Sequence, residues 1–144
     1  MSLVLEIVTI LWIALSTFSI AKGATTAALW GGDKKGAVSI TFQGGLPSQF
    51  NNAFPILQQH GLKTTFFIIS ADANQTAVQT LDANGQEIGS QTVTDHSLTT
   101  LPYSLQVYEM SQSQLYLQQL TGQKIDTLAY PNGDYNTEVM NIAR

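Results

Sequence analysis

Residues able to take part in acid-base or metal chemistry gather after predicted strands, and they include Asp95, His96 and Asp134. The chain has no cysteine, so any chemistry must come from carboxylate, imidazole, hydroxyl or backbone groups. A hydrolytic metal needs about three protein ligands and open positions for water and substrate. Asp95 and His96 could together bind a metal, but adjacent residues usually point to different sides of the chain. We therefore expect His96 to be a loop residue without a ligand role.

The elements that must position these residues alternate regularly between strand and helix. Strands are predicted at 37–42, 62–69, 86–90 and 125–130, where β-branched and apolar residues are bounded by turn residues. Helices are predicted at 49–60, 74–83, 102–120 and from 137 onward, where apolar residues recur at helical spacing. This alternation predicts an α/β fold with a parallel sheet or barrel and right-handed crossovers. Chemistry in such folds lies at the carboxyl ends of strands, here after Phe42, Ser90 and Tyr130.

Two details of the predicted helices bear on packing. Pro55 lies inside the first helix and should kink it, because proline lacks a backbone N–H and its ring clashes with the preceding turn. The longest helix is expected to turn Leu105, Tyr108, Leu115 and Tyr116 toward the core.

The composition is that of one compact domain. The chain has 144 residues, of which 44% are hydrophobic and 11% charged, and its formal net charge is -4. Its six lysine and arginine residues are scattered and form no basic stripe that could neutralise a phosphate backbone. Nucleic acid is therefore not an expected partner.

The beginning of the chain differs from the rest in being almost wholly apolar between Leu3 and Ile20. Small residues follow at the positions that a signal peptidase reads, so residues 1–21 are predicted to be a signal peptide and 22–36 a linker. The expected location is secreted or at the cell surface. The alternative is an uncleaved anchor, since the run approaches the roughly 20 residues that span a bilayer, and only then would a membrane be a partner.

Three segments that follow predicted strands match known motifs in order and spacing. Residues 39–45 read Ser-Ile-Thr-Phe-Gln-Gly-Gly, residues 87–98 begin Glu-Ile-Gly-Ser-Gln, and residues 128–133 read Leu-Ala-Tyr-Pro-Asn-Gly. They resemble the Thr-Phe-Asp-Asp-Gly, His-Thr-x-x-His and Arg-x-Pro-Tyr-Gly motifs of the polysaccharide deacetylase family (NodB homology, carbohydrate esterase family 4). The resemblance covers 37–144 and implies a partial (β/α) barrel of the NodB type with mainly parallel strands. It also implies a domain incomplete at its C-terminus, because the family's later Asp-Trp and Leu-His motifs are absent.

The resemblance assigns positions for a base and a metal, but the residues there have changed. In the family, the first aspartate is the general base, while the second aspartate and the two histidines hold zinc or another divalent metal. Gln43 stands at the base position, and Gly44, Gln91 and Asp95 stand at the metal-ligand positions. An amide cannot take a proton from water as a carboxylate can. Only Asp95 keeps a metal-binding carboxylate, so no cofactor is expected to bind.

The third motif is better preserved. The resemblance implies that the backbone N–H of Asn132 is an oxyanion donor, and that Tyr130, Pro131 and Gly133 contact the substrate. Tyr130 and Tyr135 could stack on sugar rings, or else Tyr130 packs in the core and Tyr135 is an exposed loop residue.

The function expected from these observations is that of a deacetylase-like domain. It would act on or bind N-acetylated glycans of the chitin type, such as acetylated chitooligosaccharides, with catalysis impaired because metal ligands and base are replaced. One alternative is an active metal-dependent deacetylase with unusual ligands. Another is a fragment without independent function.

Overall fold

A computed structural model describes residues 34 and 36–144 of the chain, and residues 38–144 form a compact unit. The predicted signal peptide at 1–21 lies outside the described residues, as does all of the predicted linker at 22–36 except positions 34 and 36. Within the described part of the chain, no helix combines the length and the apolar character needed to cross a membrane.

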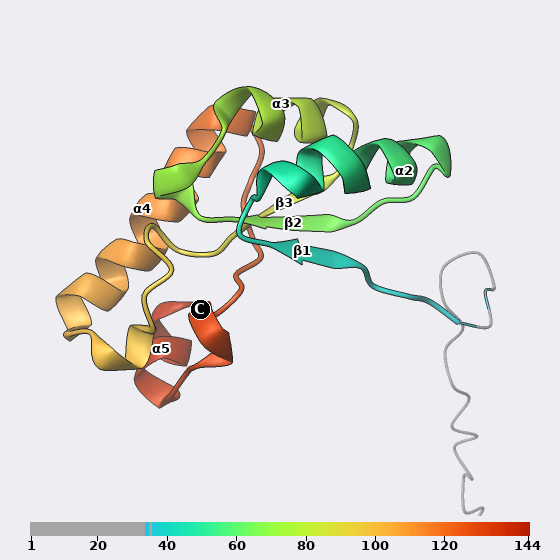
Figure 1. Ribbon diagram of the computed structural model, residues 1–144. Helices are drawn as coiled ribbons and strands as arrows, with labels where there is room; N and C mark the ends of the chain where they lie inside the picture. Colours follow the sequence, from blue (N-terminus) through green and yellow to red (C-terminus); the bar gives the residue numbers. More distant parts are fainter. Residues whose placement is uncertain (1–33, 35) are drawn as a thin grey trace, which may run out of the picture. The chain divides into compact units, whose positions relative to one another are not determined.

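The compact unit alternates between strands and helices, as predicted (Figure 1). Its elements are β1 (Thr41–Gln43), a π-helical turn (Gln49–Ala53), α2 (Phe54–Gln59), β2 (Thr65–Ile68), α3 (Gln75–Ala83), β3 (Glu87–Ser90), α4 (Tyr103–Thr121) and α5 (Thr137–Ile142). Short 3-10 turns lie at Ser70–Asp72, Leu98–Thr100 and Pro131–Gly133. The three strands form one parallel sheet in the order β1, β2, β3, with Phe42 beside Phe66 and Phe66 beside Ile88. The predicted parallel α/β arrangement is therefore confirmed.

The strand predicted at 125–130 is largely absent, which corrects the prediction. Only Leu128 pairs with β3, as an isolated parallel bridge to Ser90. Ser90 N–H donates to the Thr127 carbonyl and Ala129 N–H donates to the Ser90 carbonyl, both at 2.9 Å. Residues 125–127, which precede the bridge and run in the same direction as β3, form no further ladder with it. The bridge is still enough to bring the loop after residue 130 to the carboxyl end of the sheet.

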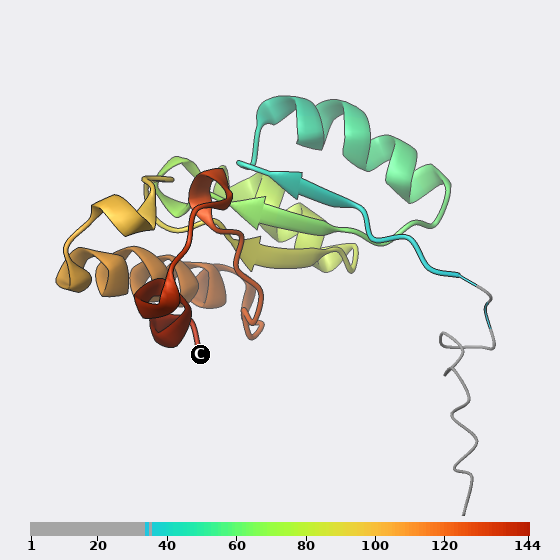
Figure 2. The same ribbon diagram turned by 90° about the horizontal axis from the view of Figure 1, so that it is seen from below.

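The irregularity predicted at Pro55 takes the form of a widened helical turn. The N–H of Phe54 donates to the carbonyl of Gln49, five residues earlier, as in a π-helix. Pro55 follows at once near the start of α2, so the widened turn lies directly before the residue that lacks a backbone N–H. Figure 2 shows the π-helical turn and α2 continuing as one helix along the edge of the sheet.

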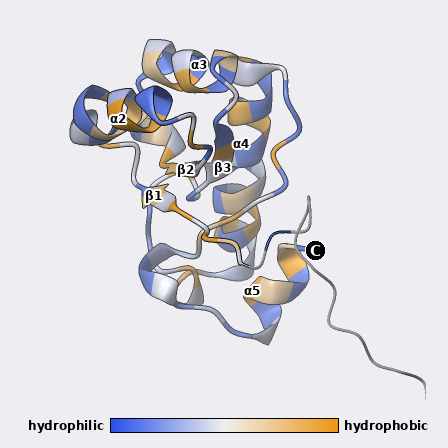
Figure 3. Cartoon of the chain, turned by 90° about the vertical axis from the view of Figure 1, so that its right-hand side faces the viewer, coloured by the Kyte–Doolittle hydropathy of each residue, from blue (hydrophilic) through white to orange (hydrophobic). Residues whose placement is uncertain are grey.

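The inward face predicted for α4 is wrong for three of its four residues. Leu105, Tyr108 and Leu115 are exposed, with 47%, 52% and 47% of their surface accessible, while Tyr116 packs against the core. The buried face instead carries Gln106, Glu109, Met110, Ser113 and Leu117. Figure 3 shows hydrophilic and hydrophobic residues mixed along α4, so hydropathy alone does not identify the inner face.

Most polar side-chain atoms on the buried face of α4 have hydrogen-bond partners, although Gln106 Oε1 is buried without one among the described residues. Ser113 Oγ accepts a hydrogen bond from Ser90 Oγ at 2.8 Å. Gln106 Nε2 donates to the Leu101 carbonyl at 2.9 Å and to Glu138 at 3.0 Å. Buried polar groups cost free energy only when they are unpaired, so this helix is held by hydrogen bonds as well as by apolar contacts.

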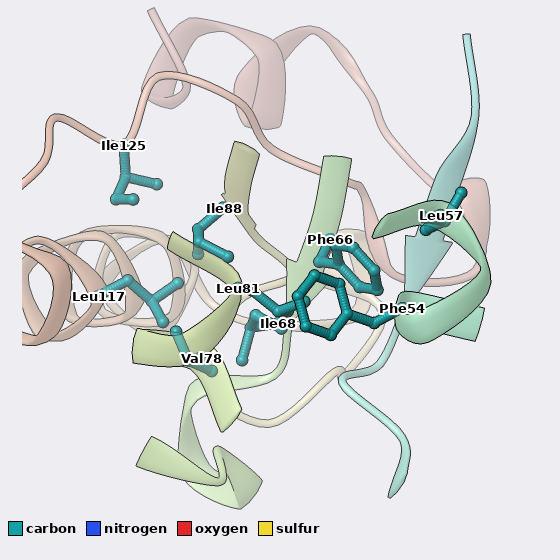
Figure 4. Close-up of a cluster of buried hydrophobic side chains, with 9 residues drawn as sticks. All are labelled: Phe54, Leu57, Phe66, Ile68, Val78, Leu81, Ile88, Leu117 and Ile125. Atoms are coloured by element: carbon teal, nitrogen blue, oxygen red, sulfur yellow. The ribbon is translucent and has the colours of Figure 1, made fainter. Parts of the chain in front are cut away.

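The main hydrophobic core lies between the sheet and its helices (Figure 4). Its buried members are Phe54, Leu57, Phe66, Ile68, Val78, Leu81, Ile88, Leu117 and Ile125. Phe66 lies at its centre and stacks on Phe42 with ring centroids 4.9 Å apart. Each fully buried side chain of this size contributes about 1.5–3 kcal/mol to folding. A smaller cluster of Leu98, Met110 and Val139 packs α5 against α4, beneath the loops that follow the strands.

Candidate functional site

The candidate site lies at the carboxyl ends of the strands, in three loops that we name by their motifs. The first-motif loop is 43–45, the second-motif loop 91–98 and the third-motif loop 130–134. The first two follow β1 and β3, parallel strands that lie on either side of β2, so both loops are at the same end of the sheet.

Gln91 joins the first two loops directly. Its Oε1 accepts a hydrogen bond from the Gly44 N–H at 2.8 Å, and its Nε2 donates to Asp95 Oδ1, also at 2.8 Å. The side chain is buried, with 6% of its surface exposed. The structure thus brings together Gly44, Gln91 and Asp95, and fills the space between the loops with an amide.

Gln43 does not join this group through any hydrogen bond of its side chain within the described residues. It is exposed at the end of β1, and its backbone carbonyl accepts a hydrogen bond from Gln49 Nε2 at 2.6 Å. The Gly44 N–H is shared between Gln91 and the Phe67 carbonyl, 2.9 Å away. The first-motif loop is therefore held by its backbone.

The second-motif loop has an unusual backbone conformation. Thr92 has a φ of 63° and Asp95 a φ of 61°, in the left-handed region that residues other than glycine rarely adopt. Each such residue costs about 1–3 kcal/mol and persists only when its surroundings hold it. Thr92 is fully buried, its N–H donates to Ser90 Oγ at 3.1 Å, and its Oγ1 accepts from the Asp95 N–H at 3.2 Å. Backbone strain of this kind is concentrated at functional sites.

Glu109 on α4 is the main anchor of this loop, and sequence reasoning missed it. Its Oε2 accepts the N–H groups of Val93 at 2.9 Å and Thr94 at 2.8 Å, and its Oε1 accepts the Thr94 hydroxyl at 2.7 Å. Only 7% of Glu109 is exposed, so the carboxylate is engaged on both oxygens in a largely dry environment. A lone acidic residue within a predicted core helix was the signal that could have revealed it.

His96 points to Thr94 and forms no hydrogen bond with Asp95. Its Nδ1 lies 2.7 Å from Thr94 Oγ1. The single hydroxyl hydrogen of Thr94 is given to Glu109, so Nδ1 of His96 carries the hydrogen in this contact. The side chain is exposed at the rim of the site.

A separate cluster ties the second-motif loop to the third. The hydroxyls of Ser97 and Thr99 both donate to Oδ2 of Asp134. These two hydrogen bonds hold the pKa of Asp134 below its usual value, and the one from Ser97 has the larger effect. This contact was also not foreseen, because short-range sequence patterns carry no information on it.

The third-motif loop presents aromatic and backbone groups. Asn132 has a φ of 57° and is exposed, and Pro131 before it is buried. Gly133 N–H donates to the Tyr130 carbonyl at 2.9 Å. Tyr130 and Tyr135 stack on one another with ring centroids 5.3 Å apart, and 56% of Tyr135 is exposed.

The donor set does not fit a divalent metal. Gly44 offers an N–H donor, both polar atoms of Gln91 are engaged, and one carboxylate oxygen of Asp95 already accepts a hydrogen bond. Across the part of the chain that the structure describes, no three histidine, cysteine, aspartate or glutamate residues are grouped closely enough to bind an ion. Of the side chains at the family's metal-ligand positions, only Asp95 supplies a carboxylate, whereas a hydrolytic metal needs about three protein ligands.

Fold and site together define the class, a partial (β/α) barrel with its motif loops at the carboxyl ends of parallel strands. A sequence model of the family described as polysaccharide deacetylase matches residues 31–144. The chain belongs to the polysaccharide deacetylase family, and the resemblance stated from its motifs is confirmed. Members of this family act on acetylated polysaccharides and generally depend on a divalent metal.

Two curated relatives show how much of a longer protein the chain matches. It is 36% identical over 122 residues to a gellan lyase of Bacillus sp, covering 81% of this chain and 5% of that protein. It is 28% identical over 112 residues to YxkH of Bacillus subtilis (strain 168), which is named as a polysaccharide deacetylase, covering 74% of this chain and 40% of that one. The chain thus spans well under two thirds of both relatives.

Solved structures confirm the fold. The Streptococcus pyogenes deacetylase PplD in complex with acetate has a TM-score of 0.74 at 26% identity, covering 76% of this chain and 52% of that one. BA3943, a pseudoenzyme of carbohydrate esterase family 4 from Bacillus anthracis, has a TM-score of 0.68 at 23% identity, covering 73% and 38%. These similarities confirm the predicted partial barrel of the NodB type.

Proposed function

We propose that this domain binds N-acetylated polysaccharides of the chitin type, and that its capacity for metal-dependent deacetylation is impaired. The observation that carries the proposal is the Gln91 amide, which is hydrogen-bonded to Gly44 and Asp95 where the family motifs have metal ligands. The family's substrates, acetylated polysaccharides, supply the chemical class of the ligand.

The impairment follows from what amide hydrolysis requires. Water must lose a proton as it attacks, and the carbonyl oxygen must be stabilised as negative charge develops on it. Gln43 has no basic lone pair with which to accept that proton. The carboxylate of Glu109 is engaged by backbone and hydroxyl donors. A backbone donor at Asn132 alone would leave most of the rate enhancement missing.

Groups suited to holding a sugar remain at the third-motif loop. The Tyr130 and Tyr135 pair offers an aromatic surface, and such faces pack against the apolar faces of pyranose rings. Pro131 and Gly133 shape the same loop, and Asn132 keeps the left-handed backbone that exposes it. We expect glycan binding to depend most on Tyr135, the more exposed member of the pair.

The test combines binding with activity. Isothermal titration of acetylated chitooligosaccharides into the full chain should show binding that Tyr135→Ala weakens at least about fivefold, with Leu115→Ala on α4 as a matched exposed control. Acetate release should stay at the uncatalysed level with or without zinc. Acetate release that a chelator abolishes would instead establish the alternative, an active metal-dependent deacetylase.

Two further points belong to this proposal. We place the domain outside the cell or at its surface, with residues 1–21 removed as a signal peptide, and N-terminal sequencing of secreted protein should begin at Lys22. The remaining alternative, a fragment without independent function, is excluded by a cooperative thermal transition of a monomer that binds glycan.

A further inference from the structure

We propose that the side-chain amide of Gln91 performs the structural work of a metal ion, cross-linking the first-motif and second-motif loops so that the site is organised without any cation. The inference rests on one part of the proposed function, the loss of the metal, and is independent of glycan binding.

The polarity of the contacts supports this role. A cation at this place would need acceptors all around it, but the first-motif loop offers a donor, the Gly44 N–H. The second-motif loop offers an acceptor, Asp95 Oδ1. A primary amide can accept a hydrogen bond through its oxygen and donate one through its nitrogen. Gln91 meets both requirements with distances of 2.8 Å, as one neutral group.

The position of Gln91 in the chain gives the cross-link its effect. It is the first residue of the second-motif loop, and it reaches Asp95, four residues later, across the strained conformation at Thr92. The same side chain holds Gly44, which is 47 residues away in sequence. Because the amide is buried, its hydrogen bonds face little competition from water. The loop is thus closed on one side by Gln91 and anchored on the other by Glu109.

The test is a double-mutant cycle of thermal unfolding on the full chain at neutral pH, using D95N, Q91E and the double variant. D95N keeps an oxygen that accepts from Gln91, so its melting temperature should match the wild type within about 2 °C. Q91E brings two carboxylates together and should lower the melting temperature by about 5–10 °C. In the double variant the amide introduced by D95N can donate to the carboxylate introduced by Q91E, which should recover most of that loss.

The effect of zinc and calcium on the melting temperature provides a second readout, which tests whether the amide stands in place of a cation. Either ion at millimolar concentration should raise the melting temperature of Q91E, whose paired carboxylates attract a cation, and leave the wild type unchanged. If Q91E does not fold, Gln91→Met removes both hydrogen bonds without adding charge and should lower the melting temperature by about 4–8 °C.

Three results would overturn the inference. The first is a melting temperature of Q91E, or of Gln91→Met if that variant is used in its place, equal to that of the wild type. The second is a double variant as unstable as Q91E, and the third is a wild type whose melting temperature zinc raises. Only the last would also count against the proposed loss of the metal. Failure of chitooligosaccharides to bind would refute the proposed function and leave the outcome of this cycle unaffected.

Discussion

Replacing Glu109 with alanine should loosen the second-motif loop more than any other single change at the site. The substitution removes a carboxylate that accepts the N–H groups of Val93 and Thr94 and the Thr94 hydroxyl. A hydrogen bond to a charged group contributes about 1.5–3 kcal/mol. Water can reach part of the loop, and the three contacts are not additive. The expected loss of unfolding free energy is therefore about 3–4 kcal/mol, a large part of the total for a domain of this size.

Glu109→Gln is the matched control for this prediction. Its amide oxygen can keep the two backbone N–H bonds, and its NH₂ group faces a Thr94 hydroxyl that can accept, so the expected loss is about 1 kcal/mol. Urea unfolding measures both free energies, and amide hydrogen exchange reports on the loop itself. Exchange at Val93 and Thr94 should accelerate at least about tenfold in Glu109→Ala. A loss under 1 kcal/mol, or unchanged exchange at these two amides, would refute the reasoning.

Two other changes test the packing and the charge of the site. Gly89→Ala should destabilise by about 1–3 kcal/mol in urea unfolding, since its methyl group would lie 2.5 Å from Phe67 Cδ1. The control is Gly36→Ala, whose methyl group would have no contact within 4 Å among the described residues, and it should change the free energy of unfolding by less than about 0.5 kcal/mol. Equal losses in the two variants would argue against the close approach of Phe67 to Gly89. Hydrogen bonds from Ser97 and Thr99 lower the pKa of Asp134 in the folded state, so the ionised carboxylate stabilises the fold. This stabilisation is fully present above the pKa of the unfolded state and is lost as the pH falls through the pKa of the folded state. The melting temperatures of wild type and Asp134→Asn should therefore differ most above about pH 5 and converge toward about pH 2, and a constant gap would contradict this.

Local signals predicted the elements of the fold well. The helix predicted at 74–83 is α3, which Asn74 caps by accepting the Ala77 N–H at 3.1 Å, and the helix predicted at 102–120 is α4, which ends before Gly122, whose φ is 72°. The inner face of α4 could not be predicted in the same way. Its buried side includes Glu109 and Ser113, whose partners lie in loops distant in sequence. Apolar spacing therefore pointed to residues that the structure exposes.

The candidate site was foreseen in its positions and missed in its interactions. Motif matching placed Gly44, Gln91 and Asp95 together, and the structure joins them by hydrogen bonds. The contacts of Glu109 with backbone N–H groups were missed because the backbone has the same donors at every residue. The short pairing at Leu128 could not be predicted either, since the β-branched and apolar residues at 125–130 do not show how many of them pair with β3.

The π-helical turn at Gln49–Ala53 has a consequence for how this chain is compared with its relatives. A turn closed by a five-residue hydrogen bond holds one residue more than an α-helical turn, so it corresponds to a single-residue insertion. Deleting one residue there would rotate the preceding residues of the helix by about 100° around the helix axis, relative to Phe54 and Leu57, which are buried in the core. It would also bring an α-helical carbonyl against the ring of Pro55. Relatives without proline at this point should therefore be one residue shorter here, and an alignment of the family should carry its gap within these five positions.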